Sequence, residues 1–494
     1  MPVDRVDPEC QAAGAGTNRA SSALLKERGK LSFVGHSRHR IGAVLGVGAA
    51  LVAGSLVAAA PAGATAVPVA HPITVHPQVA PAGHPGAAAS FSCQSRPLDG
   101  SQGPRCYQPA QVQQAYEVTP LIDAGKDGRG RTIVIVDAYG SPTIARDLQI
   151  FDSTFGLPAA DFTQIAPAGA PPAFDPTDDN QVGWGVETTL DVEWANAIAP
   201  GAKVVLAIAK SNEDADILAT TKYVIDHNVG DVVSQSFGEA EQCMDPQLLD
   251  EQHRLFERAV RKGITLFASS GDSGAAQAGC DGTGALRAAS TPASDPNVTG
   301  VGGTTLDADT TTGAYLGETA WTEPFGCNPP AVAPEDVNCS GGGFSTLYGK
   351  PAYQAGFVPG RARGVPDVAY NAGVASGVLI HCGFCNVVYG AGSPEDPIFF
   401  IIGGTSAGSP QWAGLGAIAD QLAHQRLGNV NPALYAIARS SQLYRAAFHD
   451  ITTGNNDVSE VGGGYDTARG WDPVTGLGSP RASRLLPLLA LMAR

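Results

Sequence analysis

Ser406 is the strongest candidate for a nucleophile in this chain of 494 residues. It lies in the segment Gly403-Gly-Thr-Ser-Ala-Gly-Ser-Pro410, directly after an apolar run at 399–402 that predicts a strand. Glycines allow a sharp turn from such a strand into a helix, whose unpaired N–H groups favour a developing oxyanion. The alternative is a glycine-rich turn in which the serine only caps the helix. A catalytic serine also needs a base that accepts its proton.

Two acidic residues four positions apart could supply that base. Glu187 and Asp191 lie within a segment at 182–199 whose apolar residues recur every four positions, which predicts a helix. Residues at i and i+4 share one face of a helix, so both carboxyl groups would point at one spot beside the buried stripe. Like charges at this spacing repel each other, and burial raises their pKa values. The alternative is a pair of solvated acids on a helix surface.

A third candidate is Asp272, in the segment Ser269-Ser-Gly-Asp-Ser-Gly274 directly after a predicted strand at 264–268. A protonated carboxyl group at a strand end can donate a hydrogen bond to an oxyanion. The alternative is an aspartate that only closes a turn with its own backbone.

The elements that must position these residues are strands alternating with helices. Strands are expected at 132–136, 204–208, 230–234 and 264–268, and helices at 182–199 and 246–262. Continuous β-branched runs suit parallel strands that are buried on both faces. The sequence therefore predicts an α/β fold, a doubly wound parallel sheet with helices on both faces. In such sheets, functional sites lie at the carboxyl ends of the strands.

Together, these motifs resemble those of the sedolisins, the serine-carboxyl peptidases with a subtilisin-like fold. Further matching segments follow in the same order: Tyr107-Gln-Pro-Ala-Gln111, Leu190-Asp-Val-Glu-Trp194, Ala199-Pro-Gly-Ala202, Val301-Gly-Gly-Thr304, Gly341-Gly-Gly-Phe-Ser345 and Pro366-Asp-Val368. The resemblance implies that Ser406 is the nucleophile, Glu187 its general base and Asp191 the acid that orients Glu187. Asp272 would be the oxyanion donor. We therefore expect a single large catalytic domain that hydrolyses peptide bonds through an acyl-enzyme, at roughly pH 3–5.

Two positions depart from the pattern of that family. Phe237 stands in Ser236-Phe-Gly238 where relatives often have Trp, and Asp137 ends a predicted strand where many have Glu. The resemblance implies that both residues support the pair of Glu187 and Asp191, so either change could alter activity or its pH range.

Two turn-rich segments near the C-terminus, 449–456 and 468–478, are similar to those that hold one Ca²⁺ in sedolisins. The resemblance implies ligands from the side chains of Asp450 and Asp472 and from the carbonyls of Ile451, Ala468 and Gly470. Calcium takes about six or more oxygen ligands, which such loops can supply. Without the resemblance, the segments would be ordinary turn-rich loops.

The N-terminal region predicts export. A basic region precedes a weakly apolar run at 41–60, and small-residue cleavage signals follow it. We expect 1–66 to be an export signal with an extended N-terminus, 67–104 a linker rich in Pro and Ala, and 105–494 the peptidase domain. The protein would then be secreted and extracellular, and a permanent membrane anchor is the alternative.

Charge and cysteine content fit that location. The formal net charge is -16, which argues against nucleic acid or anionic membranes as partners. The resemblance implies protein or peptide substrates, and we expect a monomer. Eight of the nine cysteines follow the signal, and an even number in an exported chain predicts disulfides. We expect neighbours to pair: Cys93–Cys106, Cys243–Cys280, Cys327–Cys339 and Cys382–Cys385. A redox or zinc half-site is the alternative for the last pair.

Other functions remain open from the sequence. One is a neutral subtilisin whose histidine base is not located, since none of the ten histidines lies in a segment of the His-Gly-Thr-His type. Another is a secreted binding protein on the same fold. Within the sedolisin family, the alternative to an endopeptidase is a tripeptidyl-peptidase.

Overall fold

The computed structural model describes residues 90–99, 101–322 and 338–492. The expected export signal, the linker before residue 90 and Cys327 lie outside these residues. Within them, no helix is both long enough and apolar enough to cross a membrane.

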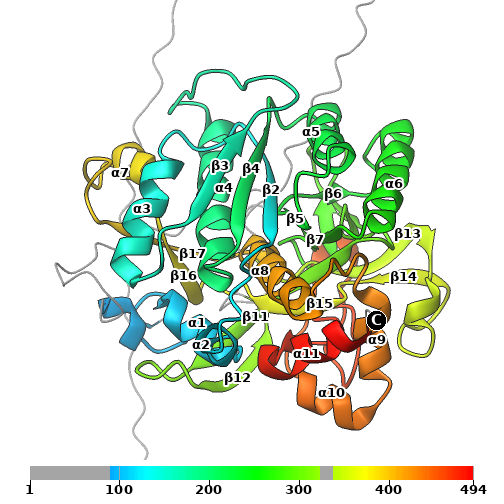
Figure 1. Ribbon diagram of the computed structural model, residues 1–494. Helices are drawn as coiled ribbons and strands as arrows, with labels where there is room; N and C mark the ends of the chain where they lie inside the picture. The colour runs from blue at the N-terminus through cyan, green and yellow to red at the C-terminus, as the bar shows by residue number, and fades with distance from the viewer. Residues whose placement is uncertain (1–89, 100, 323–337, 493–494) are drawn as a thin grey trace, which may run out of the picture. The chain divides into compact units, whose positions relative to one another are not determined.

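The described residues form one central sheet of eight strands (Figure 1), in the order β12-β11-β7-β5-β2-β4-β3 with β15 paired to β11. The strands are β2 (Thr132–Ala138), β3 (Asp161–Ile165), β4 (Lys203–Ala209), β5 (Val232–Gln235), β7 (Thr265–Ser269), β11 (Thr299–Ala308), β12 (Tyr315–Ala320) and β15 (Val368–Asn371). All neighbours are parallel except β11 and β12. The predicted doubly wound parallel sheet is confirmed, with one antiparallel edge strand.

Helices cover both faces of this sheet, as predicted. The long helices α4 (Asp179–Ile198) and α8 (Thr405–Ala423) pack side by side on one face, whereas α5 (Asp214–Asp226) and α6 (Pro246–Arg261) cover the other. The remaining α-helices of the described part are α1 (Pro109–Ala115), α2 (Thr119–Asp123), α3 (Ile144–Phe155), α7 (Gly383–Val388), α9 (Asn431–Ala438), α10 (Ser441–Ala447) and α11 (Ala482–Met492).

The side chains of β2 alternate between two hydrophobic cores. Ile133 and Ile135 belong to the core that contains α4 and α8, whereas Val134 and Val136 belong to the core that contains α5 and α6. Successive residues of a strand point to opposite faces. Asp137 therefore points to the same side as Ile133 and Ile135, which is the side of α4.

A second sheet lies beside α4 and leads into α8. It joins β1 (Arg105–Tyr107), β16 (Ser376–His381) and β17 (Phe399–Ile402), and β17 is the strand predicted before Ser406. The shorter paired strands are β6 (Glu239–Ala240) with β10 (Ser290–Thr291), β8 (Ala276–Ala278) with β9 (Ala285–Arg287), β13 (Gly343–Gly349) with β14 (Ala362–Val365), and β18 (Phe448–His449) with β19 (Ser479–Pro480).

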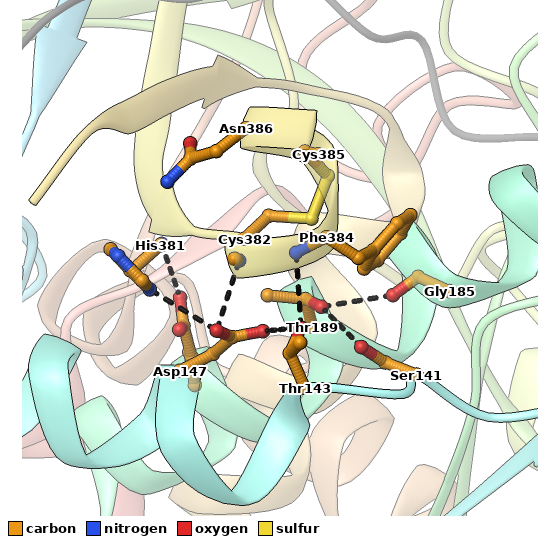
Figure 2. The surroundings of a disulfide bond; sticks show 12 residues. Ser141, Thr143, Asp147, Gly185, Thr189, His381, Cys382, Phe384, Cys385 and Asn386 are labelled. Carbon is orange, nitrogen blue, oxygen red and sulfur yellow. Dashed lines mark hydrogen bonds and ion pairs between the residues drawn. A yellow bond between two sulfur atoms is a disulfide. The ribbon is translucent and has the colours of Figure 1, made fainter. Parts of the chain in front are cut away.

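Three of the expected disulfides are present in the described part: Cys93–Cys106, Cys243–Cys280 and Cys382–Cys385. The fourth expected pair includes Cys327, outside that part. Figure 2 shows Cys382 and Cys385 bonded to each other at the start of α7, and both residues are buried. These two cysteines therefore form a structural clip in this structure, not a metal half-site.

The domain begins earlier than the predicted boundary at residue 105. Phe91 is buried, and its ring lies 5.2 Å from that of Phe399 and 5.9 Å from that of Phe155. The following turn of 3-10 helix, Ser92–Ser95, is tied to β1 through Cys93. The Pro- and Ala-rich composition of the segment did not indicate that it packs on the domain, because only Phe91 and the disulfide of Cys93 make the attachment.

Candidate active site

Glu187 and Asp191 lie one turn apart in the interior of α4. Asp178 caps the start of the helix, because its side chain accepts a hydrogen bond from the N–H of Asn180 at 3.0 Å. Every residue from Trp184 to Ile198 is buried, since the helix lies between the central sheet, the β16 sheet and α8. The alternative of two solvated acids on a helix surface is therefore wrong.

Several contacts fix α4 in this position. Gly185 leaves room for the ring of Phe384, because a Cβ at this glycine would lie 2.8 Å from it (Figure 2). Further along, a carboxylate oxygen of Glu193 accepts a hydrogen bond from the N–H of His381 at 3.0 Å. The indole of Trp194 donates to the carbonyl of Leu379 at 3.0 Å. These contacts tie the helix to β16 and to the clip at α7, so they restrict movement of the two acids.

Ser406 lies in the first turn of α8, as the sequence predicts. The chain leaves β17 and turns through Gly404, whose φ of 102° is accessible to glycine and strained for other residues. Ser406 is 2% exposed. The hydroxyl of Ser236, at the end of β5, donates to the carbonyl of Ser406 at 3.4 Å. The nucleophile candidate is thus held in place from both the helix and the sheet.

Glu187, Asp191 and Ser406 share one small buried space. Burial and the nearby Asp137 raise the pKa of Glu187 well above its usual value, whereas the hydroxyl of Ser406 favours its charged form. The contact between the two acids lowers the pKa of Glu187 and raises that of Asp191. Within the described residues, neither carboxylate oxygen of Glu187 makes a hydrogen bond of good geometry. Its side chain therefore lies near Ser406 and Asp191 without a well-formed hydrogen bond to either. The pKa values of both acids are raised, so the pair holds at least one proton where free carboxyl groups would be fully ionised.

Asp137 is the third carboxyl group of this cluster. It ends β2 on the side of α4, and burial raises its pKa to about 7. Its charge in turn raises the pKa values of Glu187 and Asp191. Three buried carboxyl groups this close cannot all ionise, so the cluster retains protons well above the pH at which free carboxyl groups lose them.

Asp272 lies in the loop after β7 and faces the start of α8. Its Oδ1 accepts hydrogen bonds from the N–H of Thr405 at 2.8 Å and from the Thr405 hydroxyl at 2.6 Å. Oδ2 has no partner within the described part and lies 2.7 Å from where a Cβ of residue 404 would stand. Burial raises the pKa of Asp272 to about 6 despite these hydrogen bonds. In mild acid the carboxyl group therefore carries a proton that it can donate beside Ser406.

Comparisons with known proteins agree with this geometry. The model of the subtilase family matches residues 178–441. Kumamolisin from Bacillus sp. (strain MN-32) is 35% identical over 398 residues, which are 79% of this chain and 64% of the relative. A solved structure of Pseudomonas sedolisin, a serine-carboxyl proteinase complexed with two molecules of pseudo-iodotyrostatin, superposes with a TM-score of 0.64. It is 30% identical, and the match covers 77% of this chain and 97% of that one.

The chain belongs to the sedolisin family. Tripeptidyl-peptidase 1 from Dictyostelium discoideum is a further relative, 27% identical over 376 residues, which are 70% of this chain and 52% of the relative. The chain thus spans 64% of the length of kumamolisin and 52% of that of the tripeptidyl-peptidase.

The candidate site lies at the carboxyl ends of strands, because Asp137 belongs to the end of β2, Ser236 follows β5 and Asp272 follows β7. The alternative of an ordinary subtilisin needs a histidine beside Ser406. The five histidines in the described part make their contacts elsewhere: His227 with Tyr223, His253 with Asp295, His381 with Asp147, His424 at the C-terminal end of α8, and His449 with Tyr315. In the described part, Glu187 is an acidic group whose side chain interacts with the hydroxyl of Ser406.

Sequence reasoning missed two residues of this sedolisin site. Thr405 holds Asp272, and Ser236 contacts both the Ser406 carbonyl and Asp191. Both lie inside quoted motifs, next to Ser406 and Phe237, but a hydroxyl beside a named residue gave no signal of its own. Phe237, the family departure, packs against Trp184 of α4 with ring centroids 6.1 Å apart.

The two C-terminal segments expected to bind calcium do come together. Asp450 Oδ1 accepts hydrogen bonds from the N–H of Gly470 at 2.9 Å and the hydroxyl of Tyr444 at 2.8 Å. Asp472 Oδ2 accepts one from the N–H of Ala468 at 3.1 Å, and Ile451 follows Asp450 directly. The donor set is all oxygen, with two carboxylates, which fits the preference of Ca²⁺.

Proposed function

We propose that this protein is a secreted, acid-active serine-carboxyl endopeptidase, a monomer that hydrolyses peptide bonds of protein substrates. The observation that carries the proposal is the position of Glu187, a buried carboxyl group that interacts with the Ser406 hydroxyl. Membership of the sedolisin family supports the same reaction class.

In the first step, Ser406 Oγ attacks the carbonyl carbon of the scissile bond, and its proton passes to Glu187. Asp191 keeps its own proton and donates a hydrogen bond to Glu187. This bond orients the base and stabilises its negative charge. Collapse of the tetrahedral intermediate breaks the C–N bond as Glu187 returns the proton to the leaving amine. Water then attacks the acyl-enzyme by the same route and releases the second product.

The developing oxyanion needs a donor on the other side of Ser406. Protonated Asp272 supplies one hydrogen bond, and backbone N–H groups at the start of α8 supply others. When Asp272 loses its proton, the donor is lost and a negative charge faces the oxyanion instead. Since the pKa of Asp272 is raised to about 6, activity should fall as the pH rises through that value.

We also propose that Asp450 and Asp472, with the carbonyls of Ile451, Ala468 and Gly470, hold one Ca²⁺. The ion would pin the loop after β18 to the loop before β19, which supports its assignment as structural. It would have no part in the chemistry at Ser406.

The first experiment is hydrolysis of acid-denatured haemoglobin from about pH 2 to 8 by the wild-type protein, Ser406→Ala and Glu187→Gln. We expect a maximum in acid that both substitutions abolish. Activity that peaks near neutrality, or that survives Glu187→Gln, would place the base elsewhere.

A second experiment separates the endopeptidase from a tripeptidyl-peptidase, the name of one relative. A peptide with a blocked N-terminus and the same peptide with a free one are compared at the acid maximum. An endopeptidase cleaves both internally, whereas a tripeptidyl-peptidase releases tripeptides from the free form alone.

A further inference from the structure

The Cys382–Cys385 clip holds one aromatic ring against helix α4. Phe384 lies inside the clip, and its buried ring reaches Gly185 of that helix (Figure 2). A Cβ on Gly185 would lie 2.8 Å from Cζ of the ring and 3.1 Å from Cε1, so a larger residue would have to push the ring or the helix aside. The glycine therefore allows the ring to pack directly on the helix backbone.

The ring of Phe384 is fixed from several sides. Phe174, in the segment that leads into α4, meets it edge-on with ring centroids 5.0 Å apart. The N–H of Phe384 donates a hydrogen bond to the hydroxyl of Thr143 at 3.2 Å, and the N–H of Gly383 donates one to Asp147 Oδ1 at 2.9 Å. Both acceptors belong to the start of α3. Since the disulfide also closes the short loop around it, the ring has little freedom to move away from α4.

The same stretch of chain contacts α4 a second time. The N–H of His381, just before the clip, donates a hydrogen bond to Glu193 at 3.0 Å, and both residues are buried. At a rise of about 1.5 Å per residue, Gly185 and Glu193 lie about 12 Å apart along the helix axis. Glu187 and Asp191 lie between these two contacts in the sequence, two residues from either one.

The two contacts lie on the side of α4 that faces away from Ser406. Successive residues of an α-helix are rotated by about 100°, so Glu187 points about 200° away from Gly185. The same angle separates Asp191 from Glu193. The clip thus supports the back of the helix, while Glu187 on its front interacts with the hydroxyl of Ser406. Because a packed interior is hardly compressible, a displacement at the back of α4 is transmitted to its front.

We propose that Phe384, held by the clip, is a positioning residue that keeps Glu187 within reach of Ser406. The role rests on the proposed peptidase function, in which Glu187 is the base. A displacement of about 1 Å in such an arrangement can lower a rate about 100-fold. The disulfide then influences kcat in addition to any contribution that it makes to stability.

Gly185→Ala and Phe384→Leu test the contact between ring and helix. Alanine is the better helix former, so Gly185→Ala cannot lower activity by weakening α4 itself. Its methyl group would meet the ring, and we expect kcat on an internally quenched peptide at the acid maximum to fall about tenfold, with KM changed by less than about twofold. Leucine lacks the ring atoms that this methyl group would meet. Gly185→Ala with Phe384→Leu should therefore regain at least about threefold of the lost kcat, and a double variant no more active than Gly185→Ala overturns the proposal.

The clip itself is removed in Cys382→Ser with Cys385→Ser, and Cys93→Ser with Cys106→Ser is the matched control. The two disulfides join cysteines 3 and 13 positions apart, respectively. The longer loop restricts the unfolded chain more, so a role in stability alone predicts the larger effect for the control. We expect the reverse for kcat per folded molecule, about a tenfold loss without the clip and less than about a twofold loss in the control. Equal losses, or a larger loss in the control, contradict the positioning role.

Hydrogen exchange in the Ser406→Ala variant separates this proposal from the peptidase proposal. Without the clip, the amides of α4 from Gly185 to Glu193 should exchange at least about threefold faster relative to those of α8. Faster exchange in α4 together with no cleavage by the wild-type protein supports the hold of the clip on α4 and overturns the peptidase proposal alone. Cleavage with unchanged exchange and unchanged kcat overturns the positioning role and leaves the peptidase intact. Neither cleavage nor a change in exchange overturns both.

Discussion

Thr405 donates two hydrogen bonds to one carboxylate oxygen of Asp272, from its N–H at 2.8 Å and from its hydroxyl at 2.6 Å. Thr405 directly precedes Ser406, so the residue that orients the proposed oxyanion donor and the proposed nucleophile are neighbours in the chain. The bonds also favour the charged form of Asp272 and oppose the effect of burial on its pKa. The two hydrogen bonds from Thr405 therefore fix the position of the Asp272 carboxyl group and also influence its pKa.

Replacing the hydroxyl of Thr405 should change the pH profile as well as the rate. In Thr405→Val, the lost hydrogen bond raises the pKa of Asp272, so the alkaline limb of the kcat profile should move to higher pH. The maximal kcat should fall about tenfold because Asp272 is less well oriented. Thr405→Ser keeps the hydroxyl and should leave the alkaline limb in place. An unchanged limb in Thr405→Val would mean that another group sets it.

Asp272 itself can be tested with a donor that does not titrate. The amide of Asp272→Asn can donate at any pH, so activity should persist above pH 6, where the wild-type protein declines. Asp272→Ala has no donor and should lower kcat about 100-fold throughout. The measurement is kcat against pH for the three proteins. Equal losses for the two variants would contradict a donor role.

The buried carboxyl groups make stability depend on pH. The pKa of Asp137 is raised to about 7, so its contribution is complete below its unfolded value near pH 4 and is lost as the pH rises to about 7. A difference of one unit between the pKa of a group in the folded and in the unfolded protein corresponds to about 1.4 kcal/mol of stability. We expect the free energy of unfolding in urea to fall by at least about 2 kcal/mol from pH 4 to 7.

The Ser406→Ala background prevents self-digestion during this measurement. Asp137→Asn should reduce the fall, because the amide does not titrate, whereas Asp161→Asn, an exposed acid on β3, should not. A free energy of unfolding that increases toward neutrality would contradict the assignment of raised pKa values to the cluster.

Removal of calcium should destabilise the protein. A ligand present at 100 times its Kd adds about 2.7 kcal/mol, so EGTA should lower Tm by at least about 3 °C relative to 1 mM Ca²⁺. Asp472→Ala should abolish this difference, whereas Asp466→Asn, an exposed acid of the same loop, should preserve it. Thermal unfolding followed by circular dichroism gives both values. The same Tm with and without calcium in the wild-type protein would exclude a structural ion.

The sequence predicted the elements whose patterns are local. The β-branched run at 132–136 became β2, and the four-residue period at 182–199 became α4. That period suggested one buried stripe, yet α4 is buried all round because two sheets and α8 enclose it. Which side of β2 carries Asp137 follows from the alternation of the strand only once its two cores are known.

Contacts between distant segments needed the structure. The bond from Thr405 to Asp272 joins residues 133 positions apart, and the pair of Asp214 and Glu239 joins a helix start to a short strand. Neither of these two contacts produces a periodic pattern in the sequence, since each depends on how segments that follow different strands meet in the fold. The sequence did not predict the burial of Phe91 for the same reason, since its partners Phe155 and Phe399 lie far along the chain.

The complete burial of α4 from Trp184 to Ile198 bears on how this protein can diverge. Almost any substitution there alters a packed interior, so Glu187 and Asp191 cannot change independently of the packing of the helix. Helices α5 and α6, in contrast, belong to the separate hydrophobic core on the opposite face of the central sheet. Substitutions in α5 and α6 leave the interior around α4 untouched, so these helices can vary between lineages while the surroundings of Ser406 stay the same.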